Sequence, residues 1–297
     1  MSKFTKFIYQ PRRIINYVIH HTAPLWPDKI YLSLKYYSKF GKSLNFNHPQ
    51  GFNAKLNWLK LNDFRPELVK MVDKVEVKDY VAGIIGEEYI IPTLAIYNSA
   101  EEIDFDALPN QFVLKCTHDS GGIVICNDKS KLNKEEVREK MRKGLLRKYF
   151  VYSREYPYKA VTPRIIAERY MADESGWQLK DYKIFCFHGE PQFIEVDYDR
   201  YVGHKLNVYD LNWNFVDFYM TSPNDKDVHI ERPAKLEEML DIARKLSKGL
   251  KFVRVDLYSI SEKIYFGELT HYPGSGFIDF HPAEYDLKLG EMLNINK

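Results

Sequence analysis

Apolar residues in the early part of the chain recur every three or four positions, which is the spacing of a buried helix face. Phe52, Leu56 and Leu59 follow this spacing clearly. From about residue 89 the period changes, and residues 89–92 and 111–116 have the composition of strands. The pattern therefore predicts helices first and a sheet afterwards.

A pair of glycines interrupts the next apolar segment. Gly121 and Gly122 stand between the strand at 111–116 and the apolar run 123–126, which predicts a β-hairpin with a glycine-bearing loop. Asn133, with a glutamate three residues later, matches a capping box and predicts that a helix begins there.

Strands dominate the second half of the chain. Leu236, Met239 and Leu240 belong to one helix that interrupts them. The predicted strands are 164–171, 181–188, 192–198, 206–211, 214–219, 252–258 and 263–269. Short turns between neighbouring strands make antiparallel hairpins, so we expect an α+β fold and not a doubly wound parallel sheet.

Length and composition indicate an ordinary globular protein. A chain of 297 residues suggests about two lobes, and 45% hydrophobic with 28% charged residues excludes overall disorder. Lys+Arg 43 and Asp+Glu 41 give a net charge of +2, which predicts no polyanionic partner. We expect no nucleic acid, because no basic stripe carries interleaved stacking aromatics beyond the N-terminal segment. The three cysteines show neither a disulfide pattern nor metal-ligand spacing, so a cytoplasmic location is expected.

The charge of the N-terminal segment differs from that of the remainder. Residues 1–50 hold eight Lys and Arg residues against one acid, Asp28. Residues 3–19 mix four cations with apolar side chains, as a membrane-surface helix does. A basic amphipathic helix packed on its own protein has the same pattern. Two hypotheses follow: internal packing, or docking at the inner face of an anionic membrane.

Residues 252–258 and the returning strand carry the clearest candidate chemistry. Side chains alternate along a strand, so Arg254 and Asp256 share one face, and Glu268 and Thr270 share a face of the returning strand. Antiparallel pairing brings Glu268 near Asp256. Two carboxylates this close repel each other unless a cation lies between them, and magnesium prefers oxygen ligands. The alternative is a solvated sheet face with a surface ion pair.

The glycine-bearing loop is a candidate phosphate site. Lys115 ends a strand, and Ser120, Gly121 and Gly122 follow. Backbone N–H groups in such a loop can converge on phosphate oxygens while a lysine neutralises their charge. Neither a Walker A motif nor a G-x-G-x-x-G after a strand occurs, so an ordinary hairpin loop is the alternative.

A third stretch could bind a purine nucleoside. Glu168 ends an apolar strand and can accept a hydrogen bond from an exocyclic amine, while the backbone near Tyr170 and Met171 reads a purine edge. On the following strand Asp181 and Lys183 share a face, which places an acid for a ribose beside a cation for a phosphate.

Taken in order, these stretches resemble the ATP-grasp superfamily, and within it the TupA-like group found with cell-surface polysaccharide genes. Residues 52–60 and 267–276 carry the closer likeness, and the whole resemblance spans about residues 40–290. It implies two α+β lobes whose antiparallel sheets grip a nucleotide. The implied parts are a helical basic N-terminal region at 1–70, a pre-grasp part at 71–105, a small lobe with the Gly-rich hairpin at 106–170, and a large lobe with the metal site at 171–297.

The resemblance also implies ATP and Mg²⁺ as cofactors and gives each candidate residue a role. Lys74 and Lys115 contact the nucleotide phosphates, and the loop residues close over the β/γ end. Adenine is held by Glu168 and the backbone of Tyr170 and Met171. Asp181 is the candidate for the ribose. The loop residues are Ser120, Gly121 and Gly122.

In the implied reaction site, Asp256 and Glu268 bind magnesium, Lys183 faces the γ-phosphate and Arg254 stabilises the reacting group. The superfamily usually has Asn where this chain has Thr270. Threonine offers one neutral oxygen on a shorter arm, so a second metal ion is expected to bind more weakly or through water.

The function implied by the resemblance is an ATP-dependent carboxylate–amine ligase acting through an acyl phosphate. It joins an amino acid or amine to a uronic-acid-type carboxylate in cell-surface polysaccharide biosynthesis, either capsular or teichuronic. A metal-dependent glycosyltransferase is one alternative, because Asp197 and Asp199 form a D-x-D pattern. A phosphotransferase on the same fold and a non-catalytic ATP-binding scaffold are the others.

Overall fold

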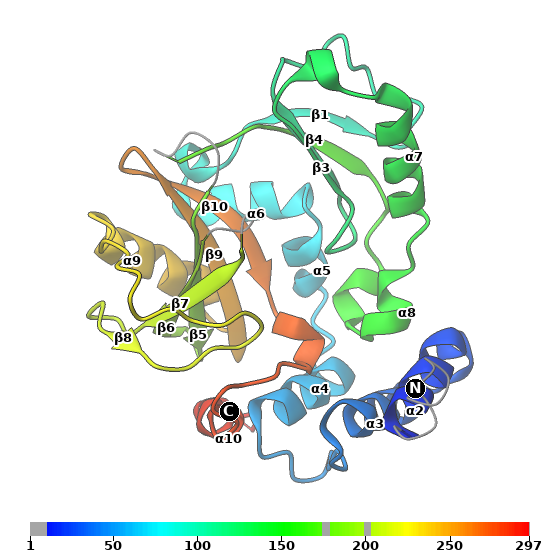
Figure 1. Ribbon diagram of the computed structural model, residues 1–297, viewed down its shortest axis with the longest axis vertical. Coiled ribbons are helices and arrows are strands. Elements are labelled where there is room, and N and C mark those ends of the chain that lie inside the picture. Colours follow the sequence, from blue (N-terminus) through cyan, green and yellow to red (C-terminus); the bar gives the residue numbers. More distant parts are fainter. Residues whose placement is uncertain (1–10, 174–178, 199–202, 297) are drawn as a thin grey trace.

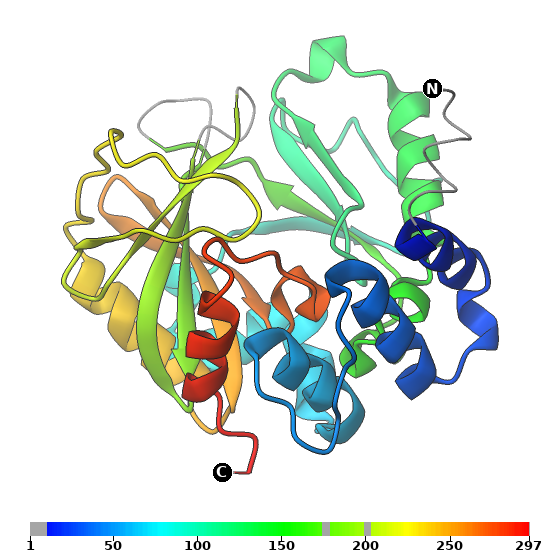
Figure 2. The ribbon, with the colours of Figure 1, turned by 60° about the horizontal axis from the view of Figure 1, so that its bottom comes forward.

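The computed structural model describes residues 11–173, 179–198 and 203–296. Its ribbon shows two sheet-containing lobes with a set of helices along one side (Figures 1 and 2). The described helices before the first strand are α2 Pro11–His21, η1 Ala23–Leu25, α3 Asp28–Phe40, α4 Phe52–Asn62, α5 Glu67–Val72, α6 Glu76–Ile85 and η2 Glu87–Tyr89. The predicted helical region is therefore confirmed from residue 11 onward, and residues 3–10 of the basic segment lie outside the described residues.

Helix α4 packs against the second half of the chain. Phe52, Leu56 and Leu59 are buried, as their spacing predicts, in a core shared with the large sheet and with α10 Tyr285–Met292. The Asn53 amide donates to the carbonyl of Ile278 at 3.0 Å, and Lys55 Nζ donates to the carbonyls of residues 290 and 293. Hydrophobic burial and these bonds together fix α4 on the large lobe.

The small lobe is a four-stranded antiparallel sheet in the order β1-β4-β2-β3. The strands β2 and β3 form the predicted hairpin around Gly121 and Gly122. Asn133 accepts from the backbone N–H of Glu136 at 3.2 Å and caps α7 Lys134–Leu145, which packs against the sheet. The strands are β1 Thr93–Tyr97, β2 Phe112–Cys116, β3 Ile123–Cys126 and β4 Ile165–Arg169.

The strand predicted at residues 89–92 is wrong: Tyr89 ends the 3₁₀ turn η2, and the first strand, β1, begins at Thr93, after the predicted segment. Proline has no N–H to donate to a sheet, so Pro92 stands before the strand and not within it. Between β3 and β4 the chain forms η3 Lys129–Lys131 before α7, and then α8 Tyr149–Ser153 and η4 Tyr156–Lys159 after it. The predicted domain boundaries stay predictions. In the structure β1, which lies in the 71–105 part, pairs with β4 of the small sheet.

The large lobe is a six-stranded antiparallel sheet in the order β10-β9-β5-β6-β7-β8. Its strands are β5 Asp181–Phe187, β6 Glu190–Tyr198, β7 Lys205–Tyr209, β8 Phe215–Val216, β9 Phe252–Ile260 and β10 Lys263–Thr270. Helix α9 Leu236–Ser247 buries its apolar face against one side of this sheet. The two antiparallel sheets and the preceding helices confirm the predicted α+β architecture.

Strand alternation separates a hydrophobic face from a polar face in the large sheet. Tyr182, Ile184 and Cys186 of β5 point into the core beneath α9, so Asp181 and Lys183 point to the opposite side. Pairing across four strands then places one polar row on that side: Glu268 opposite Asp256, Asp256 opposite Lys183, and Lys183 opposite Glu195.

A β-bulge at Gly267 gives Glu268 its place in this row. Phe266 pairs with Leu257 but Glu268 pairs with Asp256, so one extra residue is accommodated between them. Without the bulge, Glu268 would stand opposite Val255, whose side chain enters the core. A Cβ at position 267 would come within 3.0 Å of the Asp256 carbonyl oxygen, so glycine suits the close approach.

Candidate active site

A cavity of about 370 Å³ is lined by residues of both sheets and of helices α5 and α6. Most of the predicted site residues line it: Lys74, Lys115, Ser120, Gly121, Gly122, Glu168, Asp181, Lys183, Arg254 and Glu268. Asp256 is fully buried and contacts the cavity through its partner Arg254. Tyr170, Met171 and Thr270 are not among the lining residues. The structure therefore gathers residues that are distant in sequence around one cavity.

The Gly-rich loop is closed on Asp119 in this structure. The Asp119 carboxylate accepts from the backbone N–H groups of Gly121 and Gly122, at 3.3 and 3.0 Å, and pairs with Arg147 at 2.8 Å. Lys74 Nζ donates to the Asp119 carbonyl. Desolvation lowers the pKa of Lys74, while the charge of Glu268 acts in the opposite direction. The N–H groups expected to face phosphate thus have an internal partner that a phosphate would have to replace.

Two lysines flank Glu168. Lys115 Nζ lies 2.6 Å from one carboxylate oxygen and Lys78 Nζ lies 2.5 Å from the other. Burial opposes ionisation of Glu168, but the two lysines outweigh it and lower the pKa of the carboxyl group. Glu168 is therefore a carboxylate that keeps two cations at one end of the cavity.

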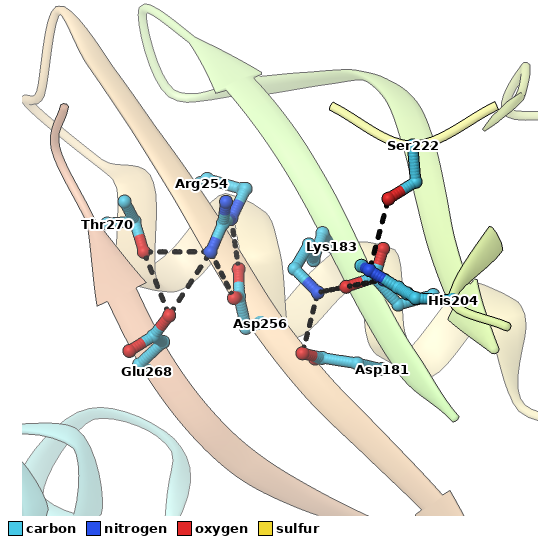
Figure 3. A network of polar contacts seen from close by, with 9 residues as sticks. Asp181, Lys183, His204, Ser222, Arg254, Asp256, Glu268 and Thr270 are labelled. Carbon is cyan, nitrogen blue, oxygen red and sulfur yellow. Dashed lines mark hydrogen bonds and ion pairs between the residues drawn. The ribbon is translucent and has the colours of Figure 1, made fainter. Parts of the chain in front are cut away.

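The residues at the predicted metal site surround a guanidinium group (Figure 3). Arg254 bonds Asp256 through two nitrogens, at 2.7 and 2.6 Å, and its Nη2 lies 3.1 Å from both Glu268 Oε1 and Thr270 Oγ1. Burial opposes ionisation of Glu268, yet Arg254, Lys74 and Lys183 together lower its pKa to about 2. Burial raises the pKa of Asp256. The predicted proximity of Asp256 and Glu268 is thus observed, with Arg254 between them.

Lys183 occupies the centre of the polar face. Its Nζ lies 2.7 Å from Asp181 and 2.5 Å from Asp197, and all three side chains are buried. Asp197 also lies 3.4 Å from His204, whose other ring nitrogen contacts Ser222 at 3.1 Å (Figure 3). Burial acts to lower the pKa of Lys183, but the surrounding carboxylates outweigh it and raise the pKa.

The donor set fits a divalent cation on charge. Two cations, Lys183 and Arg254, share this sheet face with more carboxylates than they neutralise: Asp181, Glu195, Asp197, Asp256 and Glu268. Burial, reinforced by the charge of Asp197, raises the pKa of Glu195 to about 7. Among the described residues, no three His, Cys, Asp or Glu side chains converge on a metal position. Arg254 fills the space between the two predicted ligands.

Sequence reasoning missed three residues of the site. Lys78 lies in the first turn of α6, just after Lys74, so the helix predicted to follow Lys74 could have pointed to it. Glu195 could have been found by pairing β6 with β5. Tyr158 lines the cavity from a 3₁₀ turn, and no pattern in the sequence indicates this.

Antiparallel sheets on either side of a cation-lined cavity are the arrangement that the resemblance to ATP-grasp proteins implies. The family model described as TupA-like ATPgrasp matches residues 54–294. The chain belongs to the TupA-like ATP-grasp family, which confirms the resemblance and the fold inferred from the sequence. A comparison with curated proteins finds no match.

Solved ATP-grasp ligases are similar to this chain at low identity. The D-alanine–D-alanine ligase of Helicobacter pylori matches at 17% identity and TM-score 0.40, over 82% of this chain and 69% of that one. The Bacillus anthracis enzyme complexed with ATP matches at 17% and 0.42, over 82% and 66%. The ligase PsnB with minimal precursor, Mg and ADP matches at 11% and 0.41, over 81% and 65%. Similarities this distant define neither substrate nor activity.

Proposed function

We propose that this chain is an ATP-dependent carboxylate–amine ligase acting through an acyl phosphate. It would join an amino acid or amine to a uronic-acid-type carboxylate in cell-surface polysaccharide biosynthesis. The observation that supports this is the cavity itself, which is lined by four cations, Lys74, Lys115, Lys183 and Arg254, and by Glu268, whose charge three of them stabilise. Such a ring of cations around a carboxylate suits a polyphosphate with a bound metal ion.

The proposal gives each side of the cavity a part of the nucleotide. Lys74, Lys115 and the loop 120–122 hold the phosphates, and the loop exchanges its bonds to Asp119 for bonds to phosphate. The end of the cavity at Glu168, with the backbone of Tyr170 and Met171, holds adenine. Asp181 holds the ribose. Asp256, Glu268 and Thr270 would hold Mg²⁺, and Arg254 would face the substrate. The bound ion would neutralise charge on the phosphates.

The chemistry requires activation of a carboxylate, whose carbonyl is electron-rich and has no leaving group. The carboxylate attacks the γ-phosphorus of ATP, ADP leaves, and an acyl phosphate results. Lys115 and Lys183 offset the charge of the moving phosphoryl group. The amine then attacks the carbonyl carbon and phosphate leaves. Arg254 stabilises the oxyanion, and one such donor typically contributes about 3 kcal/mol.

A product assay tests this proposal. We expect ADP and phosphate to be released only when ATP, Mg²⁺, a uronic acid and an amine are all present, across a matrix of uronic acids and amino acids. Lys115→Ala should abolish release, because Lys115 holds the phosphates. Lys131→Ala is the matched control, since its side chain is 83% exposed and outside the cavity. Formation of AMP and pyrophosphate would contradict the proposal.

The same assay addresses the alternatives. Transfer of phosphate to a hydroxyl acceptor without an amine would indicate a phosphotransferase, and unchanged partner binding without turnover would indicate a scaffold. For the glycosyltransferase alternative, Asp197 is buried and bound by Lys183, and Asp199 lies outside the described residues. No observation favours the glycosyltransferase.

We further propose that the basic helices dock this enzyme on the cytoplasmic face of an anionic membrane. In α2 only Ile19 is buried, while Tyr17 and Val18 are 55% and 45% exposed. Arg12 and Arg13 are exposed on the same helix, and Leu25 in the following turn is 80% exposed. Apolar side chains beside cations suit the interface of an anionic bilayer. Within the described residues no helix is long and apolar enough to cross a bilayer.

Vesicle co-sedimentation tests the docking. The full chain should sediment with phosphatidylglycerol-containing vesicles and not with phosphatidylcholine alone, and added salt should weaken the binding. Arg12→Glu with Arg13→Glu should abolish it. Lys140→Glu with Lys143→Glu on α7 is the control, because the same charge change is made on another exposed helix. Equal loss in both double variants, or no binding at all, would refute the docking.

A further inference from the structure

Lys78 lines the cavity but is not among the residues to which the proposed function gives a role. Its ammonium group lies 2.5 Å from Glu168 Oε1 and donates to the carbonyl of Ile91 at 2.7 Å. Lys78, Glu168 and Ile91 all line the cavity. The Lys78 side chain is only 12% exposed, so burial would disfavour its charge without the carboxylate. Lys78 and Glu168 are thus a buried ion pair in the wall of the proposed nucleotide site.

This ion pair joins the two lobes. Lys78 is on α6, whose Val77 and Val81 pack into the core formed by the large sheet and α9. Glu168 is on β4, an interior strand of the small sheet that pairs with β1 and β2. The Ile91 carbonyl fixes the ammonium group of Lys78 further. Lys78 is therefore held by the large lobe and contacts the small lobe at Glu168.

Lys115, the other lysine on Glu168, is more accessible. It pairs with Ile123, directly after Gly122, so its backbone lies next to the Gly-rich loop. Its ammonium group lies 2.6 Å from Glu168 Oε2, and its side chain is 23% exposed. Within the ranges that the structure describes, Glu168 is the only ion-pair partner of Lys115. Lys115 can therefore leave Glu168 more readily than Lys78 can.

The two lysines repel each other, and Glu168 compensates for this repulsion. Burial lowers the pKa of Lys78, the charge of Glu168 acts in the opposite direction, and the charge of Lys115 adds to the lowering. If Lys115 alone neutralised Glu168, moving its ammonium group to a phosphate would leave a buried carboxylate without a cation. Such a change is strongly unfavourable. With Lys78 in place, the carboxylate keeps one cation when Lys115 leaves.

We infer that Lys78 is a positioning residue that makes Lys115 available to the nucleotide phosphates. This rests on the proposed ligase function, in which Lys115 binds the phosphates. When ATP binds, the ammonium group of Lys115 exchanges the Glu168 oxygen for phosphate oxygens. Lys78 stays on Glu168, so the carboxylate remains ionised and can accept from adenine. No covalent bond changes in this step, and Lys78 itself does not contact the phosphates.

Calorimetric titration with ATP and Mg²⁺, without acid or amine, tests this role. Lys78→Met should weaken ATP binding about 30-fold, because Lys115 then becomes the one cation on Glu168 and is held there. Lys78→Arg keeps the charge and should restore most of the affinity. Lys129→Met is the matched control. It also removes a lysine that donates to backbone carbonyls of the small lobe, those of Phe105 and Leu108, but Lys129 does not line the cavity.

A second substitution separates an action through Glu168 from a direct contact with the nucleotide. Glu168→Gln removes the charge that holds Lys115 and keeps an oxygen that can accept from the exocyclic amine of adenine. In this background Lys78→Met should change the ATP affinity by about twofold or less, so the two effects should not add. Circular dichroism shows whether each variant is folded. Lys78→Gln, which keeps a donor to Glu168 without the charge, takes the place of Lys78→Met if that protein unfolds.

The outcomes separate this inference from the ligase function. A loss of affinity in Lys78→Met that disappears in the Glu168→Gln background supports the positioning role. Unchanged affinity in folded Lys78→Met, or an equal loss in both backgrounds, overturns the role of Lys78 while the ligase function stands. Absence of ATP binding by the unaltered protein overturns the ligase function and the inference with it.

Discussion

Asp256→Asn is expected to lower ADP release about 1000-fold. Asp256 is fully buried and binds Arg254 through two hydrogen bonds, so the amide cannot reproduce the bidentate ion pair. The same change removes one of the two carboxylates proposed to hold Mg²⁺. Arg254 and the metal site are therefore affected together. The measurement is ADP release at saturating ATP with the acid and amine identified in the matrix assay.

The matched control for this prediction lies on the same hairpin. Glu262→Gln removes a carboxylate at the exposed turn between β9 and β10, and turnover should not change. Thermal unfolding of both variants shows whether the sheet is intact. Near-normal turnover in a folded Asp256→Asn protein would show that the proposed metal site is wrong.

Lys183→Met is expected to destabilise the fold by about 3–5 kcal/mol, as loss of one partner from a buried ion pair does. Lys183 is 5% exposed and lies between Asp181 and Asp197, which are 4% and 5% exposed. Methionine fills similar volume but leaves two neighbouring carboxylates without the ammonium group. Urea unfolding followed by circular dichroism measures the free energy of unfolding.

The destabilisation should depend on pH in a definite direction. Burial acts to lower the pKa of Lys183, but the surrounding carboxylates outweigh it and raise the pKa in the folded protein. The stability that Lys183 contributes is therefore present below the unfolded pKa of lysine, about 10.4, and is lost as pH rises through the raised folded-state value. The deficit of the variant relative to the unaltered protein should therefore be full at neutral pH and shrink in strongly alkaline solution. Lys205→Met removes a partly exposed ion pair with Asp225 and should lower the free energy of unfolding much less than Lys183→Met does. A pH-independent deficit at Lys183 would contradict the explanation.

The sequence was sufficient to predict the order of elements and the meeting of Asp256 and Glu268. Strand alternation places Arg254 and Asp256 on one face, and this holds whatever the details of packing. The residue that stands opposite Glu268, by contrast, depends on the bulge at Gly267. A single glycine in a strand does not show whether the strand has a bulge there. Alternation therefore predicts the sheet face on which a side chain lies, whereas its neighbour on the next strand can be identified only from the backbone structure.

Side-chain partners were beyond prediction for a different reason. Arg254 was expected beside the carboxylates, and in the structure its guanidinium lies between them, because rotamers follow from the local electrostatic field. Glu155 attracted no attention in the sequence. It is buried in the structure, and its hydrogen-bond partner Ser275 is far from it along the chain and meets it only in the folded protein.

The attachment of α4 to the final helix bears on the order in which the protein can be assembled during synthesis. The small sheet is built from β1 to β4, which are contiguous enough to pair while translation continues. The core around Phe52 is different, because α4 obtains Asn53–Asp286 and Lys55–Leu293 contacts only after residues 278–293 have left the ribosome. This early helix therefore acquires its tertiary contacts only after almost the whole polypeptide has been synthesised, and the large lobe is completed last.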